Sequence, residues 1–216
     1  RELTLPKFLH WVPMVTREPN PEGKGEVSML DLMVNSLRMR PDRIIVGEIR
    51  RQREAEILFE AMHTGHSVYA TVHADNVEQA VNRITHPPIN VPKEMMDALA
   101  GIVVTFRHRR FNIRRVLEFG EILKSGDFRI IHRWDVKNDE MKQVAGLSRL
   151  ADTITLYAGL SEKEIQEDLD KKSEVLSWMT ANDYVDVDQV GKIVSQYYLN
   201  EDEVYDAALK NVKWKF

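Results

Sequence analysis

Two short stretches of the sequence carry the residues best suited to chemistry. Arg43-Ile-Ile-Val-Gly-Glu48 is an apolar run that ends in a carboxylate, and His66 and His73 flank the run from Ser67 to Val72. In open α/β sheets, ligands bind at the carboxyl ends of the strands. A carboxylate there can hold Mg²⁺ through water or accept a proton from an attacking water, and a histidine can donate a hydrogen bond to a phosphate oxygen. The alternatives are that Glu48 simply ends a strand and that the histidines are ordinary core or surface residues.

Arginines form a third candidate set. Arg17, Arg38, Arg40 and Arg43 lie around the first stretch in the sequence. The planar guanidinium suits phosphate oxygens, and an arginine from a neighbouring subunit is a common device in nucleotide hydrolysis. The alternative is a solvated face. A metal site formed by the two histidines is not expected, because the period-2 alternation of a strand puts His66 and His73 on opposite faces.

The elements that must position these residues alternate in type along the first part of the chain. Ser28 with Asp31 resembles a capping box, Pro41 stops a helix, and Asn76 with Gln79 caps another. The pattern predicts a helix from Ser28, a strand at 43–46, a helix at about 53–64, a strand at 67–72 and a helix from Asn76 to about Ile84. This order predicts an α/β layer with a parallel sheet, in which the apolar strand at 43–46 is covered on both faces.

The rest of the chain has a different character. A short helix near 93–100 precedes three β-rich runs that predict an antiparallel meander, at 101–106, 112–123 and 128–134. From Ser148 the pattern is helical, with a capping box at Ser161–Glu164 and further helices at 188–198 and 201–209. An apolar stripe of Ile165, Leu169, Leu176 and Met179 is expected to face a core. We therefore predict two domains, residues 1–145 and residues 146–216.

Composition excludes several classes of protein. The 216 residues include no cysteine, which rules out a disulfide scaffold, a tetracysteine zinc site and a cysteine nucleophile. No run of about 18 apolar residues is present, so no membrane span is expected. The net charge is -4. Residues 1–115 have 17 Lys+Arg against 14 Asp+Glu, and residues 116–216 have 13 against 20. This balance lacks the bulk charge of a nucleic-acid binder.

Taken together, the motifs resemble one family. Leu37-Arg-Met-Arg-Pro-Asp-Arg-Ile-Ile-Val-Gly-Glu-Ile-Arg50, then Glu54-Ala55, Thr64-Gly-His66 and Ala70-Thr-Val-His-Ala74, are similar to the secretion ATPase superfamily. That family drives type II secretion, type IV pili and the archaeal flagellum. The stretch through Glu48 resembles its Walker B region, and the stretch from Thr64 to Ala74 resembles its histidine box. The archaeal branch is suggested by three further features: Val15-Thr-Arg17, Pro88-Ile-Asn-Val-Pro92 and the helical tail.

The resemblance implies a fold and partners. The fold would be the C-terminal part of a RecA-like P-loop core, a parallel sheet plus an antiparallel meander, followed by a small all-α domain. The protein would be a hexameric ATPase that uses ATP and Mg²⁺. It would work with an integral membrane platform protein, at the cytoplasmic face of the membrane.

The resemblance also implies roles for individual residues. Glu48 would polarise water near Mg²⁺, which it would contact through water, and His73 would lie near the γ-phosphate. His66 would shape the same strand from its other side. Arg38 and Arg40 would lie near a subunit boundary, and Arg17 would be a candidate for a contribution in trans.

The phosphate-binding loop is missing from the sequence. Such a loop needs Gly-x-x-x-x-Gly-Lys-Ser/Thr. Gly23-Lys24-Gly25 has the letters without the spacing. In the family this loop precedes the segment where the present sequence starts, and Arg1-Glu2-Leu3 resembles the end of the family's aspartate box. We therefore expect a C-terminal fragment that by itself neither binds ATP tightly nor hydrolyses it.

Two other functions are compatible with the residues. A RecA-like nucleic-acid motor would need a basic, aromatic channel. Its candidate residues are Arg107, Arg109, Arg110, Arg114, Arg115, Phe106 and Phe111. A non-catalytic docking module would use the acidic helical tail to bind a partner. The histidine box favours the secretion branch, so nucleic acid is not expected as a partner.

Overall fold

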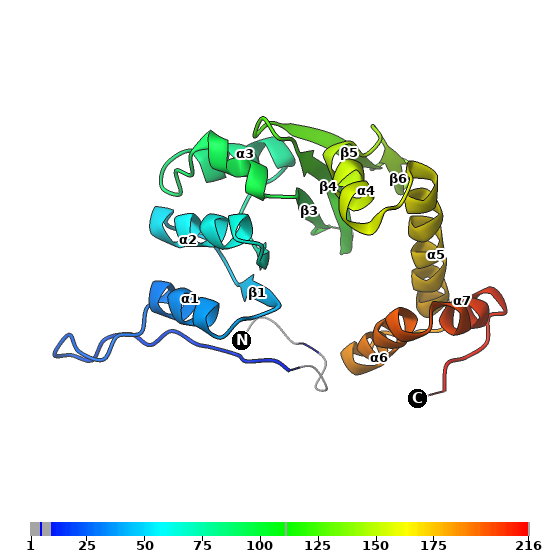
Figure 1. Cartoon of the computed structure of the whole chain (residues 1–216), viewed down its shortest axis with the longest axis horizontal. Coiled ribbons are helices and arrows are strands. Elements are labelled where there is room, and N and C mark those ends of the chain that lie inside the picture. Colours follow the sequence, from blue (N-terminus) through cyan, green and yellow to red (C-terminus); the bar gives the residue numbers. More distant parts are fainter. Residues whose placement is uncertain (1–4, 6–9, 111, 216) are drawn as a thin grey trace. The chain divides into compact units, whose positions relative to one another are not determined.

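The computed structural model describes residue 5, residues 10–110 and residues 112–215. Arg1-Glu2-Leu3 and Phe111, which entered the sequence predictions, lie outside the described residues. The chain divides into two compact units, one of residues 14–152 and the other formed mainly by residues 153–216. Figure 1 shows the elements of both. In the described part of the chain, no helix is long and apolar enough to cross a membrane.

The first unit begins with helices and strands in alternation. They are α1 (Met29–Arg38), β1 (Arg43–Val46), α2 (Gln52–His63), β2 (Ser67–Ala70), α3 (Val77–Thr85) and the 3₁₀ helix η1 (Lys93–Ala98). The predicted caps are confirmed: Asp31 N donates to Ser28 Oγ at 3.2 Å, and Gln79 N donates to Asn76 Oδ1 at 2.8 Å. These side chains satisfy amide groups that have no partner inside the helix, which is why the helices begin where they do.

β1 and β2 pair in parallel, as the strand–helix–strand order predicts. Ile44 is opposite Val68, and Val46 is opposite Ala70. The prediction that β1 is covered on both faces is wrong. Ile44 and Val46 are buried, but Ile45 is 43% exposed and Tyr69 is 58% exposed. In this chain α1 and α2 cover only one face of the two-stranded sheet, so burial alternates along β1.

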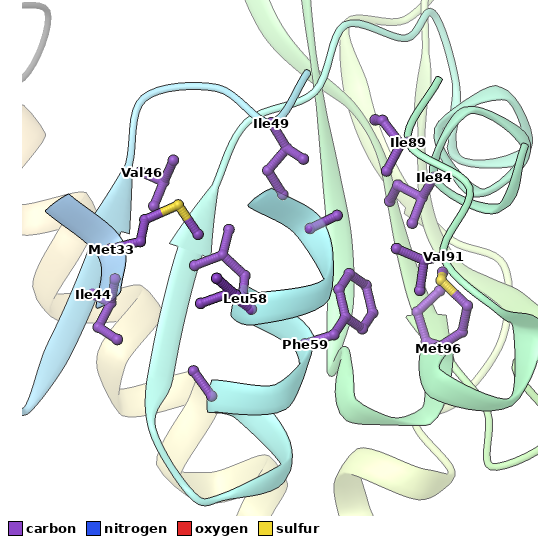
Figure 2. Close-up of a cluster of buried hydrophobic side chains, with 14 residues drawn as sticks. Met33, Ile44, Val46, Ile49, Leu58, Phe59, Ile84, Ile89, Val91 and Met96 are labelled. Carbon is purple, nitrogen blue, oxygen red and sulfur yellow. The ribbon is translucent and has the colours of Figure 1, made fainter. Parts of the chain in front are cut away.

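The hydrophobic core of this unit lies between α1, α2 and the strands. Figure 2 shows Met33 of α1 beside Ile44 and Val46 of β1, with Leu58 and Phe59 of α2 at its centre. The same cluster continues to Ile84, Ile89, Val91, Met96 and Ile122. One continuous apolar cluster therefore fixes β1 and α2, and with them the segment after β1 that carries Glu48.

A four-stranded antiparallel sheet follows, in the order β3-β4-β5-β6. β3 (Gly101–His108), β4 (Ile113–Ile122) and β5 (Phe128–Asp135) are the predicted meander, and β6 (Glu140–Gln143) is a strand that the sequence analysis missed. β6 has four exposed residues and no apolar alternation, so its sequence gives no strand signal. The overall architecture is mixed α/β, with one parallel and one antiparallel sheet.

Two buried carboxylates of β4 anchor helices to this sheet. Glu118 accepts a hydrogen bond from Val77 N at the start of α3 (3.1 Å) and one from Arg133 Nε (2.9 Å). Glu121 is fully buried and accepts hydrogen bonds from Ser148 N and Leu150 N at the start of α4 (Arg149–Ala158). Carboxylates at helix N-termini satisfy free amides and complement the helix dipole. Glu118 and Glu121 therefore fix where α3 and α4 begin.

The second unit is helical, with α5 (Glu162–Ala181), α6 (Val187–Leu199) and α7 (Glu201–Leu209). The capping box at Ser161 and Glu164 is present. The predicted core stripe on α5 is only half right. Ile165 and Met179 are buried, whereas Leu169 is 43% exposed and Leu176 is 56% exposed. The residues that α5 buries against α6 and α7 are Val175, Trp178 and Met179, which are centred roughly 100° around the helix axis from Leu176.

Candidate functional site

Glu48 and His73 meet just beyond the carboxyl ends of β1 and β2. The parallel pairing continues past both strands, because Ile49 N donates to Thr71 O at 3.0 Å and Thr71 Oγ1 donates to Gly47 O. This pairing brings the residue after Gly47 next to the residue after Val72. Glu48 Oε1 lies 3.4 Å from His73 Nε2. The structure thus brings together the two residues that the sequence analysis placed at one sheet edge.

Arg50 completes the arrangement, and the sequence analysis did not select it as a site residue. Its Nε and one terminal nitrogen each lie 2.6 Å from Glu48 Oε2. The hydrogen bond from Arg50 is the largest effect and lowers the pKa of the Glu48 carboxyl. Burial opposes it, and the nearby charges of Arg50, His73 and Arg83 each lower the pKa by a smaller amount. Glu48 is therefore a carboxylate near neutral pH.

The site is open to solvent. The Glu48 side chain is 17% exposed, but the side chains of Arg50 and His73 are 74% and 82% exposed. Two solvent-exposed groups that can donate hydrogen bonds therefore lie next to a largely buried carboxylate. An anionic ligand could reach Arg50 and His73 from solvent without any rearrangement of the sheet.

The side chains around Glu48 determine which metal ion or anion this edge of the parallel sheet could bind. Within the described ranges, no cluster of three or more His, Asp or Glu residues could hold a metal ion. Glu48 is a single hard oxygen ligand, which suits a Mg²⁺ ion that keeps most of its waters and takes its other ligands from phosphate. The surrounding Arg50, His73 and Arg83 suit phosphate oxygens. The residues present therefore fit a magnesium–phosphate group that is held mainly by other ligands.

The other predicted site residues do not join this cluster in any contact of the described residues. Arg38 ends α1, and Arg40, two residues later, is exposed with a left-handed backbone (φ 51°). Arg17 pairs through its backbone with Val27, and its Nε donates to Gly25 O. The side chain of Arg17 therefore stabilises the loop between Arg17 and Val27.

His66 lies at the opposite end of β2 from His73. Its Nδ1 is 3.2 Å from Ala61 O and 3.3 Å from Thr64 Oγ1, at the C-terminal end of α2. β2 runs from Ser67 to Ala70, so the full length of the strand separates the two histidines. In this chain His66 caps a helix and does not contact Glu48. The sequence contains a signal for this difference, because His66 precedes the strand whereas His73 follows it.

Comparison with known proteins identifies the class. Residues 11–108 match the model of the family described as type II/IV secretion system protein. The sequence resemblance is therefore confirmed at the level of this family over residues 11–108. The matched segment contains β1, β2, Glu48 and His73.

Individual relatives cover different shares of the chain. An uncharacterized protein of Methanocaldococcus jannaschii, MJ1287, is 35% identical over 175 residues, which are 77% of this chain and 64% of the relative. The type IV pilus assembly ATPase PilB of Thermus thermophilus is 34% identical over 106 residues, 49% of this chain and 11% of the relative. The type IV pilus ATPase PilU of Pseudomonas aeruginosa is 42% identical over 52 residues, 24% of this chain and 14% of the relative. The chain thus spans less than two thirds of each of these relatives.

Proposed function

We propose that this chain is the C-terminal part of a motor ATPase of a secretion, pilus or archaeal-flagellum system. The proposal rests on one observation above all: Glu48 and His73 are in contact at the carboxyl edge of two parallel strands, inside the segment that matches the family. Two relatives bear the name of type IV pilus ATPases. ATP hydrolysis by this protein, assembly as a hexamer and a membrane platform protein as partner are parts of the proposal.

The proposed fold is part of a RecA-like core. A two-stranded sheet is marginally stable without the helices that pack on it, and Ile45 and Tyr69 are exposed on the face that α1 and α2 leave open. A RecA-like sheet would supply further parallel strands and a cover for that face. We propose that residues 1–145 belong to such a core and that residues 146–216 form a C-terminal helical domain.

The proposed chemistry assigns one task to each side chain. Bound Mg-ATP would supply the γ-phosphate as the electrophile. Glu48, which is ionised, accepts a hydrogen bond from the attacking water and orients it. His73 and Arg50 stand where they can donate hydrogen bonds to phosphate oxygens, and Arg50 would have to leave Glu48 to do so. Arg17, Arg38 and Arg40 remain candidates for a subunit boundary, and His66 remains a candidate for shaping β2.

The sequence contains no Gly-x-x-x-x-Gly-Lys-Ser/Thr loop. We therefore propose that the 216 residues alone neither bind ATP tightly nor hydrolyse it. Calorimetric titration of this chain with Mg-ATP tests the point. Heat that fits a micromolar dissociation constant would show that the second half of the site binds nucleotide without the phosphate-binding loop, and would remove this part of the proposal.

The catalytic role of Glu48 is tested in a longer form of the protein that contains the phosphate-binding loop. Glu48→Gln keeps the shape of the side chain and removes its basicity, so the turnover number should fall by roughly 10²–10⁴-fold. Glu56→Gln is a matched control, because Glu56 is an ionised glutamate of α2 whose hydrogen bonds and ion pair are with Gln52 and Arg53. Equal turnover in Glu48→Gln and wild type would exclude Glu48 as the residue that activates water.

A further inference from the structure

The hairpin of β3 and β4 carries a concentration of positive charge that the proposed ATPase chemistry does not use. Residues 101–116 contain five arginines, Arg107, Arg109, Arg110, Arg114 and Arg115, and no aspartate or glutamate. Most of these side chains are exposed. We call Arg107, Arg109 and Arg114 the hairpin arginines.

Arg107 and Arg114 lie directly opposite each other in the register of the two strands. Residues directly opposite in an antiparallel pair share a face, and like charges at such positions destabilise the sheet. Within the part of the chain that the structure describes, neither side chain has a hydrogen bond or an ion pair. Arg115 shows the contrast, because Asp139 contacts its guanidinium at 2.7 and 2.5 Å. The positive charge of Arg115 is therefore balanced by Asp139, whereas the charges of Arg107 and Arg114 have no acidic partner among the described residues.

Exposed apolar side chains stand beside these arginines. Val116, two residues after Arg114 on the same strand and therefore on the same face, is 38% exposed. Val103 on β3 is 59% exposed. A surface that combines arginines with aliphatic side chains matches the boundary between lipid headgroups and acyl chains, where the cations meet phosphate and the aliphatic groups leave water. Single-stranded nucleic acid instead needs aromatic faces on which bases can stack. Phe106 is 38% exposed, but it lies on the opposite face of β3 from Arg107, and the centroid of its ring is 5.9 Å from that of Trp134.

We propose that the β3–β4 hairpin is a membrane-surface contact that binds the phosphate headgroups of anionic lipids through Arg107, Arg109 and Arg114. Lipid phosphates separate the like charges of Arg107 and Arg114 by placing negative charge between them. The contact is peripheral and reversible, and its strength depends on ionic strength. The inference rests on the charges of the hairpin and needs no nucleotide, so it can hold or fail independently of the proposed ATPase function.

Co-sedimentation of the 216-residue chain with vesicles tests the proposal. Vesicles of phosphatidylglycerol mixed with phosphatidylcholine should bind the chain, and vesicles of phosphatidylcholine alone should not. The double variant Arg107→Ala/Arg114→Ala should bind the anionic vesicles roughly 30-fold more weakly, because each arginine near an anionic surface contributes roughly a fivefold factor. Removal of two opposed like charges should leave the melting temperature equal or higher, so loss of binding would not reflect unfolding.

Three further variants sharpen the result. Arg107→Lys/Arg114→Lys should bind almost as well as wild type, since a lipid surface responds to charge more than to the planar fork. Val116→Ser should weaken binding less than the double alanine variant. Arg129→Ala, an exposed arginine of β5 outside the hairpin, is the matched control and should bind like wild type.

Three results would overturn the proposal. One is equal binding of the double alanine variant and wild type to anionic vesicles. Another is binding to phosphatidylcholine alone that equals binding to the anionic mixture. The third is tighter binding to a labelled single-stranded oligonucleotide than to vesicles, lost in both the alanine and the lysine variants, which would assign the hairpin to nucleic acid instead.

Discussion

Glu48 Oε1 lies 3.4 Å from His73 Nε2, although a whole helix separates the two residues in the sequence. The contact arises because β1 and β2 are parallel, so that their carboxyl ends meet at one edge, and because the backbone pairing extends to Ile49 and Thr71. Arg50 contacts the other carboxylate oxygen. The carboxylate thus has a distinct partner on each oxygen, and those partners can be removed one at a time.

Removal of Arg50 should raise the pKa of Glu48. The hydrogen bond from Arg50 is the largest cause of the lowered pKa of that carboxyl, and Arg50→Ala removes both the bond and the charge. The pKa of Glu48 should therefore move up toward its usual range, as measured by NMR titration of the glutamate side-chain carboxyl carbons. Arg53→Ala is the control: it should raise the pKa of Glu56, whose hydrogen bond it removes, and leave that of Glu48 unchanged. An unchanged Glu48 pKa in Arg50→Ala would mean that the 2.6 Å contact does not persist in solution.

Glu121→Ala should destabilise the first unit by about 1–3 kcal/mol, because it leaves the partly buried amides of Ser148 and Leu150 at the start of α4 without an acceptor. Glu121 is fully buried and accepts from Leu150 N at 2.6 Å. Urea unfolding measures the change. Glu60→Ala, at an exposed position of α2, should change the free energy of unfolding by less than about 0.5 kcal/mol. Equal effects of the two substitutions would show that water replaces Glu121 as the acceptor.

Gly120 is required by close packing between β4 and α3. A Cβ at this position would lie 2.7 Å from Val77 Cγ1, and Val77 is fully buried. Gly120→Ala should therefore destabilise the protein by about 1–3 kcal/mol through overpacking. Gly146→Ala is the matched control, since a Cβ there meets nothing within 4 Å, and it should change stability by less than about 1 kcal/mol. Thermal unfolding measures the stability of both variants. An unchanged melting temperature in Gly120→Ala would mean that α3 can shift on the sheet to make room for the methyl group.

The β5–β6 hairpin should loosen in acid. Hydrogen bonds from Lys142 and Asn138, with a smaller contribution from the Lys137 amide, lower the pKa of Asp135 from 3.8 to about 2. Because the pKa is lower in the folded state, the stabilisation is fully present above the unfolded value and is lost as pH falls from about 4 to about 2. The protection factors of the amides of residues 140–143, which correct for the change of the intrinsic exchange rate with pH, should therefore fall over that range.

Asp135→Asn provides the control for the acid effect. It should give low protection factors at residues 140–143 at every pH and abolish their change between about pH 4 and about pH 2. Loss of β3 protection over the same pH range as β6 would instead indicate global unfolding of the sheet.

Much of the fold could be predicted from the sequence, because its signals act over a few residues. The caps at Ser28, Asn76 and Ser161 are local hydrogen bonds, and the structure contains all three. The alternation of strands and helices predicted the parallel pairing, and the β-rich runs predicted the meander. β6 was missed because its burial does not alternate, and Leu169 and Leu176 were misplaced because helical spacing alone cannot tell a core stripe from an exposed one.

The sequence by itself determined the order of the elements, the caps and the placement of Glu48 and His73 at one edge, since parallel strands necessarily align their carboxyl ends. Only the tertiary structure decided that Arg50 holds the second carboxylate oxygen while His66 caps α2 at the far end of β2. It also decided that Glu121 is buried and that Arg107 lies opposite Arg114. Side-chain contacts of this kind depend on register, rotamer and packing between segments that are distant in sequence, and local periodicity contains no information about them.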